Sequence, residues 1–334
     1  MSTRHTHLGR SGLQVSRLAL GTMNFGPLTD EATAHTILDA AVSSGINLID
    51  TADVYGADAN RQVYGHEPEK GRTEEIIGTW LAKTPARRDQ VVLATKVYGA
   101  MGSGVNDIRL SARHIRRACD ESLRRLQTDH LDLYLLHHVD RSTPWEEIWE
   151  ALSLLRQQGK VLYFGTSNHA GWHIVRGQAV AERRGMLGFV VEQSIYSLMQ
   201  RSVELEVLPA CRDLGIGFLP YSPLYGGLLG GILRKQHAAR SKEGRAATGL
   251  RSSREQIERY EKACDDFGEH PAVVALAWLL HQPGVTAPIV GARTVEHLAL
   301  AERALDVTLD SGQLALLDAV FPGPGGPAPE AYAW

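Results

Sequence analysis

Cysteine is scarce in this chain of 334 residues, which contains only Cys119, Cys211 and Cys264. The three cysteines lie far apart and show no Cys-x-x-Cys spacing, so neither a disulfide framework nor a zinc site is predicted. We expect three buried free thiols and no bound metal.

Long apolar runs are absent as well. No stretch approaches the roughly 18 apolar residues that a membrane helix needs, and the opening MSTRHTHLGRSG lacks the apolar centre of a signal peptide. The net charge is −3 and the basic residues are scattered, so no patch for nucleic acid is apparent. The sequence therefore predicts a cytoplasmic protein that binds neither membranes nor nucleic acids.

The first strand-to-helix turn lacks a dinucleotide-binding motif, because it reads GTMNFG rather than G-x-G-x-x-G. This disfavours an open, doubly wound sheet. Eight short apolar runs instead alternate with longer helical stretches, and runs that are continuously apolar are typical of parallel strands covered by helices. Eight such units predict a closed (β/α)8 TIM barrel. The predicted strands are 18–21, 47–51, 91–96, 131–137, 161–166, 190–193, 217–221 and 287–290.

Helix signals separate the predicted strands. The clearest begins with Thr143 as a cap, followed by proline and then Glu146, and Gly159 ends that helix. Glycines 45, 185 and 215 also stand where a helix should end. Before the first strand, Gly12 divides 8–16 into two short runs, which predicts an N-terminal β-hairpin covering the bottom of the barrel.

Three connections are longer than a minimal barrel needs, namely 55–73 after strand 2, 224–254 after strand 7 and the Pro/Gly-rich tail 322–334. The second is rich in Arg, Lys, Gly and Ser, so we expect a mobile surface loop that also closes over a ligand. The prolines of the tail exclude a helix there. No segment resembles a linker, and we expect 1–334 to form one domain.

Four polar side chains stand at or just after the ends of predicted strands: Asp50, Tyr55, Lys96 and His137. Carboxyl ends of barrel strands carry the reactive groups of such folds. Asp50 should keep Lys96 protonated, and that cation would lower the pKa of the Tyr55 phenol from about 10 by ~1 to 3 units. A neutral His137 could donate a hydrogen bond to a carbonyl oxygen that gains negative charge. A purely structural alternative is an Asp50–Lys96 ion pair that fills the barrel.

Strand alternation separates His137 from the neighbouring His138. Only one of them can face the barrel interior at that height, and His137 shares its face with Leu133 and Leu135. His138 is therefore the second candidate, after His137, for the hydrogen-bond donor to the carbonyl oxygen.

Seven motifs recur in a characteristic order: DTADVYG, TKVYG, LDLYLLHH, FGTSN, EQSIYS, YSPLYGGLL and IVGART. Together they resemble the aldo-keto reductase superfamily over about 8–321. The segments LSARHIRRACDESLRRL, DRSTPWEE, ELEVLPAC and APEAYAW are similar to an actinobacterial-type subgroup that includes nucleotide-linked deoxyhexose 2,3-reductases.

The resemblance implies a barrel that binds NADPH (NADP+) without a Rossmann motif and reduces an aldehyde or ketone. It places Asp50, Tyr55, Lys96 and His137 on the catalytic tetrad, with Tyr55 as the proton donor. The further cofactor contacts that it implies are Gly21, Thr22 and Met23 at the first strand, Ser167, Asn168 and Gln193 at the nicotinamide carboxamide, Tyr221 stacked on the ring, Ser222, Pro223, Leu224, Gly227 and Leu228 around the pyrophosphate, and Gly291, Arg293 and His297 toward the adenosine.

The sequence departs from the family at the adenosine end. His297 and Ala301 replace a usual Gln and Asn, and Ile232 stands where a basic residue is often found. Arg293 remains, and its guanidinium could bind a 2′-phosphate or stack on adenine. We therefore expect NADPH rather than NADH.

The predicted substrate pocket is aromatic and suits many small-molecule carbonyls; its members are Phe25, Tyr98 and Trp172, with the tail residues Tyr332 and Trp334 as further candidates. Three other functions stay open. A deoxysugar-nucleotide reductase would need contacts for a diphosphate, and an aldolase would use Lys96 as a Schiff-base former. The third is a cofactor-sensing subunit similar to the potassium-channel β subunits of this superfamily. The oligomeric state is not predicted.

Overall fold

The centre of the molecule is a barrel of eight parallel strands in the order β10-β3-β4-β5-β6-β7-β8-β9. The computed structural model describes residues 4–56, 69–237 and 245–329. The barrel strands are β3 Ala19–Gly21, β4 Leu48–Asp50, β5 Val92–Val97, β6 Leu131–Leu136, β7 Val161–Ser167, β8 Phe189–Ile195, β9 Gly217–Tyr221 and β10 Ile289–Val290. All eight predicted strands are confirmed, with ends shifted by one or two residues.

The two ends of the sheet meet just before β10. A parallel bridge joins Phe218 of β9 to Val285, and the Thr286 amide donates to the Phe218 carbonyl at 2.9 Å. Because β10 also pairs with β3, the sheet returns on itself. The (β/α)8 prediction is therefore confirmed.

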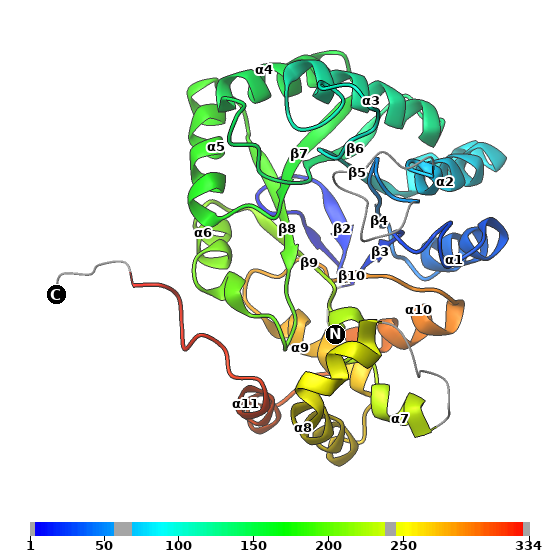
Figure 1. Cartoon of the computed structure of the whole chain (residues 1–334), viewed down its shortest axis with the longest axis vertical. Helices are drawn as coiled ribbons and strands as arrows, with labels where there is room; N and C mark the ends of the chain where they lie inside the picture. Colours follow the sequence, from blue (N-terminus) through cyan, green and yellow to red (C-terminus); the bar gives the residue numbers. More distant parts are fainter. Residues whose placement is uncertain (1–3, 57–68, 238–244, 330–334) are drawn as a thin grey trace.

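Helices surround the strands (Figure 1). They are α1 Glu31–Ser43, α2 Arg72–Lys83, α3 Ala112–Leu126, α4 Trp145–Gln157, α5 Gly171–Arg183, α6 Val207–Asp213, α7 Ile232–His237, α8 Arg245–Asp266, α9 Pro271–His281, α10 Val295–Glu302 and α11 Ser311–Val320. The short 3-10 helices are η1 Pro85–Gln90, η2 Ser202–Glu204, η3 Tyr225–Gly227 and η4 Arg303–Leu305. None of the described helices combines the length and apolarity required to cross a bilayer.

Strand alternation divides the buried side chains into two cores. One lies between strands and helices, and the other fills the barrel interior, where Leu48 and Leu135 are fully buried. Successive side chains of a strand point to opposite faces. Asp50 and His137 each follow one of these interior leucines by two residues, so they face the barrel axis as predicted.

An N-terminal hairpin closes the bottom of the barrel, as predicted, but its first strand lies before the expected range 8–16. Its strands β1 His5–His7 and β2 Gln14–Ser16 pair antiparallel. Leu8 is fully buried in the interior core, and the Arg10 amide donates to the carbonyl of Gly215 at 2.7 Å, just before β9 begins. Water is thus kept from the end of the barrel opposite the strand carboxyl ends.

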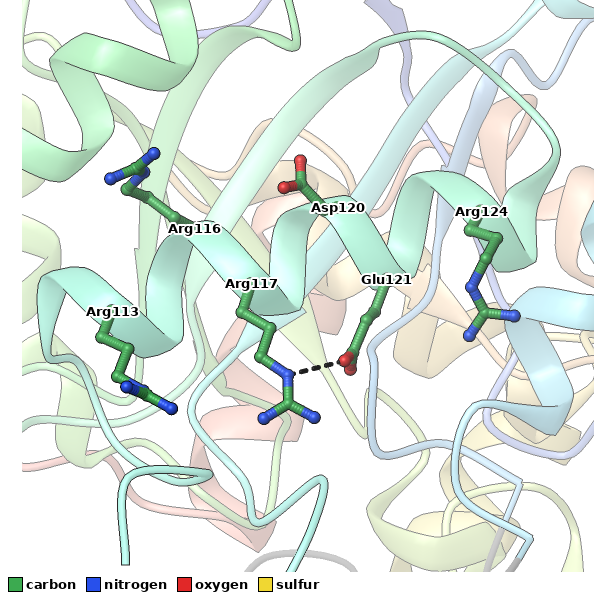
Figure 2. A pocket seen from close by; sticks show the side chains of 6 residues that line it. All are labelled: Arg113, Arg116, Arg117, Asp120, Glu121 and Arg124. Carbon is green, nitrogen blue, oxygen red and sulfur yellow. Dashed lines mark hydrogen bonds and ion pairs between the residues drawn. The ribbon is translucent and has the colours of Figure 1, made fainter. Parts of the chain in front are cut away.

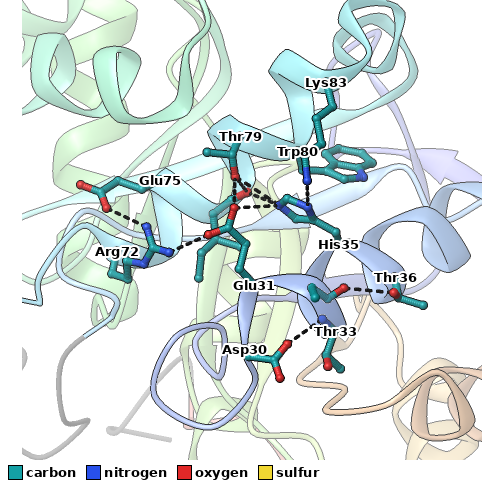
Figure 3. A network of polar contacts seen from close by, with 12 residues as sticks. Asp30, Glu31, Thr33, His35, Thr36, Arg72, Glu75, Thr79, Trp80 and Lys83 are labelled. Carbon is teal, nitrogen blue, oxygen red and sulfur yellow. Dashed lines mark hydrogen bonds and ion pairs between the residues drawn. The ribbon is translucent and has the colours of Figure 1, made fainter.

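Polar contacts join neighbouring helices outside the barrel (Figure 3). Between α1 and α2, Lys83 Nζ lies 3.0 Å from His35 Nδ1, and His35 Nε2 lies 2.9 Å from the Ile76 carbonyl. The lysine is the donor in the first contact, so the histidine proton is on Nε2. Between α2 and α3, Glu74 and Arg125 form a buried ion pair at 2.7 Å.

The structure corrects the expected loop 224–254. Apart from 238–244, which lies outside the described residues, this segment contains η3, α7 and the start of α8. Further along α8, Ile257, Tyr260 and Cys264 are buried at helical spacing, and this apolar stripe stabilises the helix. Non-helical backbone occurs at Ser253, where φ is −127°. The tail 322–329 contains no helix, as predicted, and its Ala328 amide donates to the Leu205 carbonyl at 2.8 Å.

Gly78 allows α2 to approach the end of α3. A Cβ at this position would lie 2.1 Å from the Arg125 carbonyl oxygen. Gly78→Ala should therefore lower the free energy of unfolding by about 1–3 kcal/mol, although alanine favours a helix by ~1 kcal/mol. Urea unfolding measures this change. Gly312→Ala on exposed α11 is the control and should be neutral or stabilising; a Gly78→Ala chain as stable as its parent would contradict this close packing.

Candidate active site

The buried amine of Lys96 is the centre of the candidate site. Its Nζ donates to Asp50 Oδ2 at 2.7 Å, to the Thr51 carbonyl at 2.8 Å and to the Tyr55 hydroxyl oxygen at 3.3 Å. Lys96 is fully buried and Asp50 is 3 % exposed. An ammonium has three N–H donors, and all three are used here.

The charge on Lys96 is stabilised by its neighbours. Burial lowers the pKa of the amine, but the Asp50 carboxylate and the Tyr55 oxygen act in the opposite direction and leave the pKa above its ordinary value. Lys96 is therefore a permanent cation at neutral pH, as expected from the sequence.

The pKa of Tyr55 differs from the expectation. Burial raises it, and the nearby Lys96 cation opposes this rise without reversing it. The expected net lowering is therefore wrong for this structure, because removal of the phenol from water outweighs one cation at 3.3 Å. Tyr55 keeps its proton at neutral pH, which is the state that a proton donor requires.

His137 lies against Tyr55, with ring centroids 5.9 Å apart and an angle of 78° between the rings. Burial, Lys96 and His138 together hold the pKa of His137 well below its usual range, so the imidazole is neutral. His138 stacks on His137 at 5.4 Å and contacts Tyr98 at 5.3 Å. The structure thus brings the preferred histidine to the phenol.

Four amide and hydroxyl side chains gather beside the four predicted catalytic residues, at or near the ends of β7, β8 and β9. Asn168 Nδ2 donates to the His137 carbonyl at 3.1 Å and to Ser167 Oγ at 3.0 Å, and Asn168 Oδ1 accepts from the Tyr221 hydroxyl at 2.8 Å. Gln193 Nε2 donates to Asp50 Oδ1 at 2.8 Å. Asn168 has a φ of 61°, a left-handed conformation that asparagine tolerates.

These contacts leave particular hydrogen-bonding groups available among the described residues. They are the Ser167 hydroxyl hydrogen, a second lone pair on the Asn168 oxygen and the Gln193 side-chain oxygen. A carboxamide has one acceptor and two N–H donors, so one donor and two acceptors match it. The residues present therefore fit a nicotinamide.

The other predicted cofactor residues lie around the same rim. Thr22 is buried and its hydroxyl donates to the Asp50 carbonyl at 2.9 Å, and Gly21 pairs with Asp50. The backbone at Ser222 has a φ of 52°. Met23 is partly buried; Pro223, Leu224, Gly227 and Leu228 run from the turn after β9 to just after η3.

Among the residues expected toward the adenosine, Gly291, Arg293 and His297 are exposed; Arg293 lies two residues before α10, and His297 lies in its first turn. Ile232 and Ala301 are 2 % and 3 % exposed and belong to the outer core. These two positions therefore contribute packing in this chain rather than a surface for adenosine.

The three predicted substrate residues that the structure describes differ in exposure. Phe25 is fully buried in the outer core. Tyr98 is 6 % exposed against His138, whereas Trp172 is 47 % exposed at the start of α5. Tyr332 and Trp334 lie outside the described residues.

The sequence did not identify two groups that support the candidate site, the Thr51 carbonyl and the Glu192 side chain. The Thr51 carbonyl binds Lys96, and no sequence pattern identifies a backbone acceptor. Glu192 is fully buried beside Gln193, where its Oε1 accepts from Ser194 Oγ at 2.5 Å and from the His169 amide at 3.3 Å. A glutamate within an apolar strand was the available signal, and its contacts support the turn that carries Asn168.

A hollow on the outer face of α3 is unrelated to the tetrad (Figure 2). Its lining residues are all charged: Arg113, Arg116, Arg117, Asp120, Glu121 and Arg124. Among the described residues no group of His, Cys, Asp and Glu is arranged to hold a metal ion, and the three cysteines are buried free thiols.

Glu192 should make the stability of the fold depend on pH. Burial raises its pKa from 4.5 to about 7. Between these values the folded chain keeps a proton that the unfolded chain loses, so the free energy of unfolding falls as pH rises toward 7. The free energy of unfolding of Glu192→Gln, measured relative to that of the parent, should therefore rise by up to about 3 kcal/mol from pH 5 to pH 8.

Urea unfolding at the two pH values measures this difference. Glu255→Gln on the exposed face of α8 is the control, because it removes the same charge from the surface. A Glu192→Gln difference that is the same at both pH values would show that Glu192 is ionised throughout this range.

Comparisons with known proteins agree with this geometry. The family model described as "Aldo/keto reductase family" matches residues 17–321. The chain is 51% identical over 334 residues to "Uncharacterized oxidoreductase YrpG" of Bacillus subtilis (strain 168), covering 99% of each chain. It is 34% identical to "Protein tas" of Escherichia coli (strain K12), covering 98% of this chain and 100% of that protein. It is 31% identical to "Versiconal hemiacetal acetate reductase" of Aspergillus parasiticus, covering 96% and 99%. The chain therefore belongs to the aldo/keto reductase family and has the fold of an oxidoreductase that acts on carbonyl compounds.

Proposed function

We propose that this chain reduces an aldehyde or ketone to an alcohol with NADPH, and that Tyr55 donates the proton. The observation that carries this proposal is the direction of one hydrogen bond. All three N–H groups of Lys96 are donors, so the Tyr55 oxygen accepts from Lys96 and its own hydrogen is free for another acceptor. A carbonyl oxygen at the barrel mouth would be that acceptor.

When bound, the reduced nicotinamide supplies a hydride to the carbonyl carbon. Tyr55 transfers its proton to the carbonyl oxygen as negative charge develops there. Lys96 then stabilises the phenolate left on Tyr55, which regains a proton from solvent. His137 is neutral, so its ring N–H can donate to the same oxygen. The acid and the oxyanion donor would thus be supplied by the connections that follow two different strands, β4 and β6.

Three side chains would orient the cofactor. The Ser167 hydroxyl hydrogen, the second lone pair of the Asn168 oxygen and the Gln193 side-chain oxygen would match a carboxamide. Gln193 also binds Asp50, which binds Lys96, so the orienting group and the acid share one network. This connection supports hydride delivery at a fixed place relative to Tyr55.

The preference for NADPH over NADH rests on Arg293. Its guanidinium is exposed beside the start of α10, where backbone N–H groups and the helix dipole also favour an anion. A 2′-phosphate is the group that distinguishes the two cofactors. A location in the cytoplasm and membership of the actinobacterial-type subgroup stay predictions.

The rival functions have less support. An aldolase needs an unprotonated Lys96, whereas this amine is a cation with three hydrogen bonds. A binding subunit without turnover does not require Tyr55 and His137 to share one site with that cation. Carbonyl reduction uses all of these groups.

Tyr55→Phe should abolish reduction of 4-nitrobenzaldehyde, with kcat lower by about 100-fold or more, because general acids contribute ~10²–10⁴-fold. The affinity for NADPH, measured by quenching of protein fluorescence, should change little. Tyr163→Phe in the first half of β7 is the matched control and should keep full activity. Undiminished turnover in Tyr55→Phe would remove the phenol from the mechanism.

A further inference from the structure

Three arginines stand on the catalytic rim of the barrel. Arg109 lies in the loop after β5, Arg141 in the loop after β6 and Arg176 in α5, which follows β7. All three are exposed, as is Trp172 at the start of α5. We call these four residues the cationic rim.

Contacts connect the cationic rim from one loop to the next. Arg109 Nη1 lies 3.5 Å from the hydroxyl of Ser142, the neighbour of Arg141 in the chain. The pKa of His173 is lowered first by burial, and Arg141 and Arg176 both add to this lowering. His173 contacts Trp172 with ring centroids 3.8 Å apart. The guanidinium carbon of Arg176 lies 5.9 Å from the Trp172 ring centroid.

The rim is continuous with the catalytic centre. The Arg109 amide donates to the Tyr98 carbonyl at 2.6 Å. From Tyr98, ring contacts lead through His138 and His137 to Tyr55, with centroid distances of 5.3, 5.4 and 5.9 Å. A substrate whose carbonyl lies at Tyr55 could therefore extend across aromatic surface toward the arginines.

Asp140, the carboxylate next to Arg141 in the chain, already accepts hydrogen bonds from other groups. Asp140 accepts from the Leu110 amide at 3.1 Å, from Thr143 Oγ1 at 2.8 Å and from both the amide and the hydroxyl of Ser142. Nearby, Glu147 accepts from the amide of Ala112. Among the described residues, no carboxylate forms an ion pair with any of the three rim arginines, whereas Arg117 and Arg183 elsewhere on the surface are paired.

We propose that the cationic rim is a substrate subsite for an anionic group, a carboxylate or a phosphate, on a carbonyl compound with a flat apolar body. This inference rests on the proposed carbonyl reduction. Trp172 would stack on the flat part, and the arginines would attract the anion. Arginine suits such a site because its planar group forms paired hydrogen bonds with carboxylate or phosphate and stacks on rings.

Two matched aldehydes test the subsite: 4′-formylbiphenyl-4-carboxylate and its methyl ester, which differ by one negative charge. For Arg141→Ala/Arg176→Ala, the ratio of kcat/KM for the carboxylate to that for the ester should fall about 2- to 30-fold, mainly through KM, because each exposed charge pair contributes a factor of about 1.4 to 5. Higher ionic strength should lower the same ratio in the parent. Lysine at both positions should restore part of it.

Arg116→Ala/Arg124→Ala on the outer face of α3 is the charge-matched control (Figure 2) and should leave the ratio unchanged. An unchanged ratio in the rim variant, or an equal loss in the control, would overturn the proposal. A 4′-formylbiphenyl phosphate distinguishes the two anions by its kcat/KM relative to the carboxylate.

Binding of biphenyl-4,4′-dicarboxylate by calorimetry separates this inference from the proposed function. If neither aldehyde is reduced, the proposed function fails, but weaker dianion binding in the rim variant than in the control variant still supports the anion subsite. Equal binding to both variants contradicts it.

Discussion

The candidate site depends on one buried cation, the ammonium of Lys96. A charge removed from water is costly unless charged and hydrogen-bonding partners replace the solvent. Asp50, the Thr51 carbonyl and Tyr55 are those partners, and they use every N–H of the amine. The same three contacts fix the phenol and direct its hydrogen away from the lysine. The contacts that stabilise the Lys96 charge are therefore part of the same network that positions the Tyr55 phenol as a proton donor.

Much of the fold was predictable because its strands are short, apolar and regularly separated by helix signals. The segment 224–254 was not, because its many Arg, Lys, Gly and Ser residues favour a loop, whereas most of the buried stripe of α8 lies after it: Leu250 falls within the segment, but Ile257, Tyr260 and Cys264 follow it. Local preference competes there with packing against the rest of the protein, and packing determines the result.

The grouping of Asp50, Tyr55, Lys96 and His137 was also predictable, since a Lys and a His at the ends of apolar strands require partners. The pKa of Tyr55 was not, because sequence identifies a cation nearby but not how completely the phenol is buried. The Thr51 carbonyl carries no sequence signal. The cationic rim could not be predicted either, because Arg109 and Arg176 belong to separate connections that only the closed barrel brings to one edge.

The most direct test of this account is the single-turnover rate of NADPH oxidation by 4-nitrobenzaldehyde in Lys96→Met. Loss of the ammonium leaves the phenolate of Tyr55 without its cation, so the rate should fall about 100-fold or more while NADPH still binds. A chain that binds NADPH and keeps a rate within about twofold of the parent would contradict the role of Lys96, since removal of a true transition-state interaction must lower this rate.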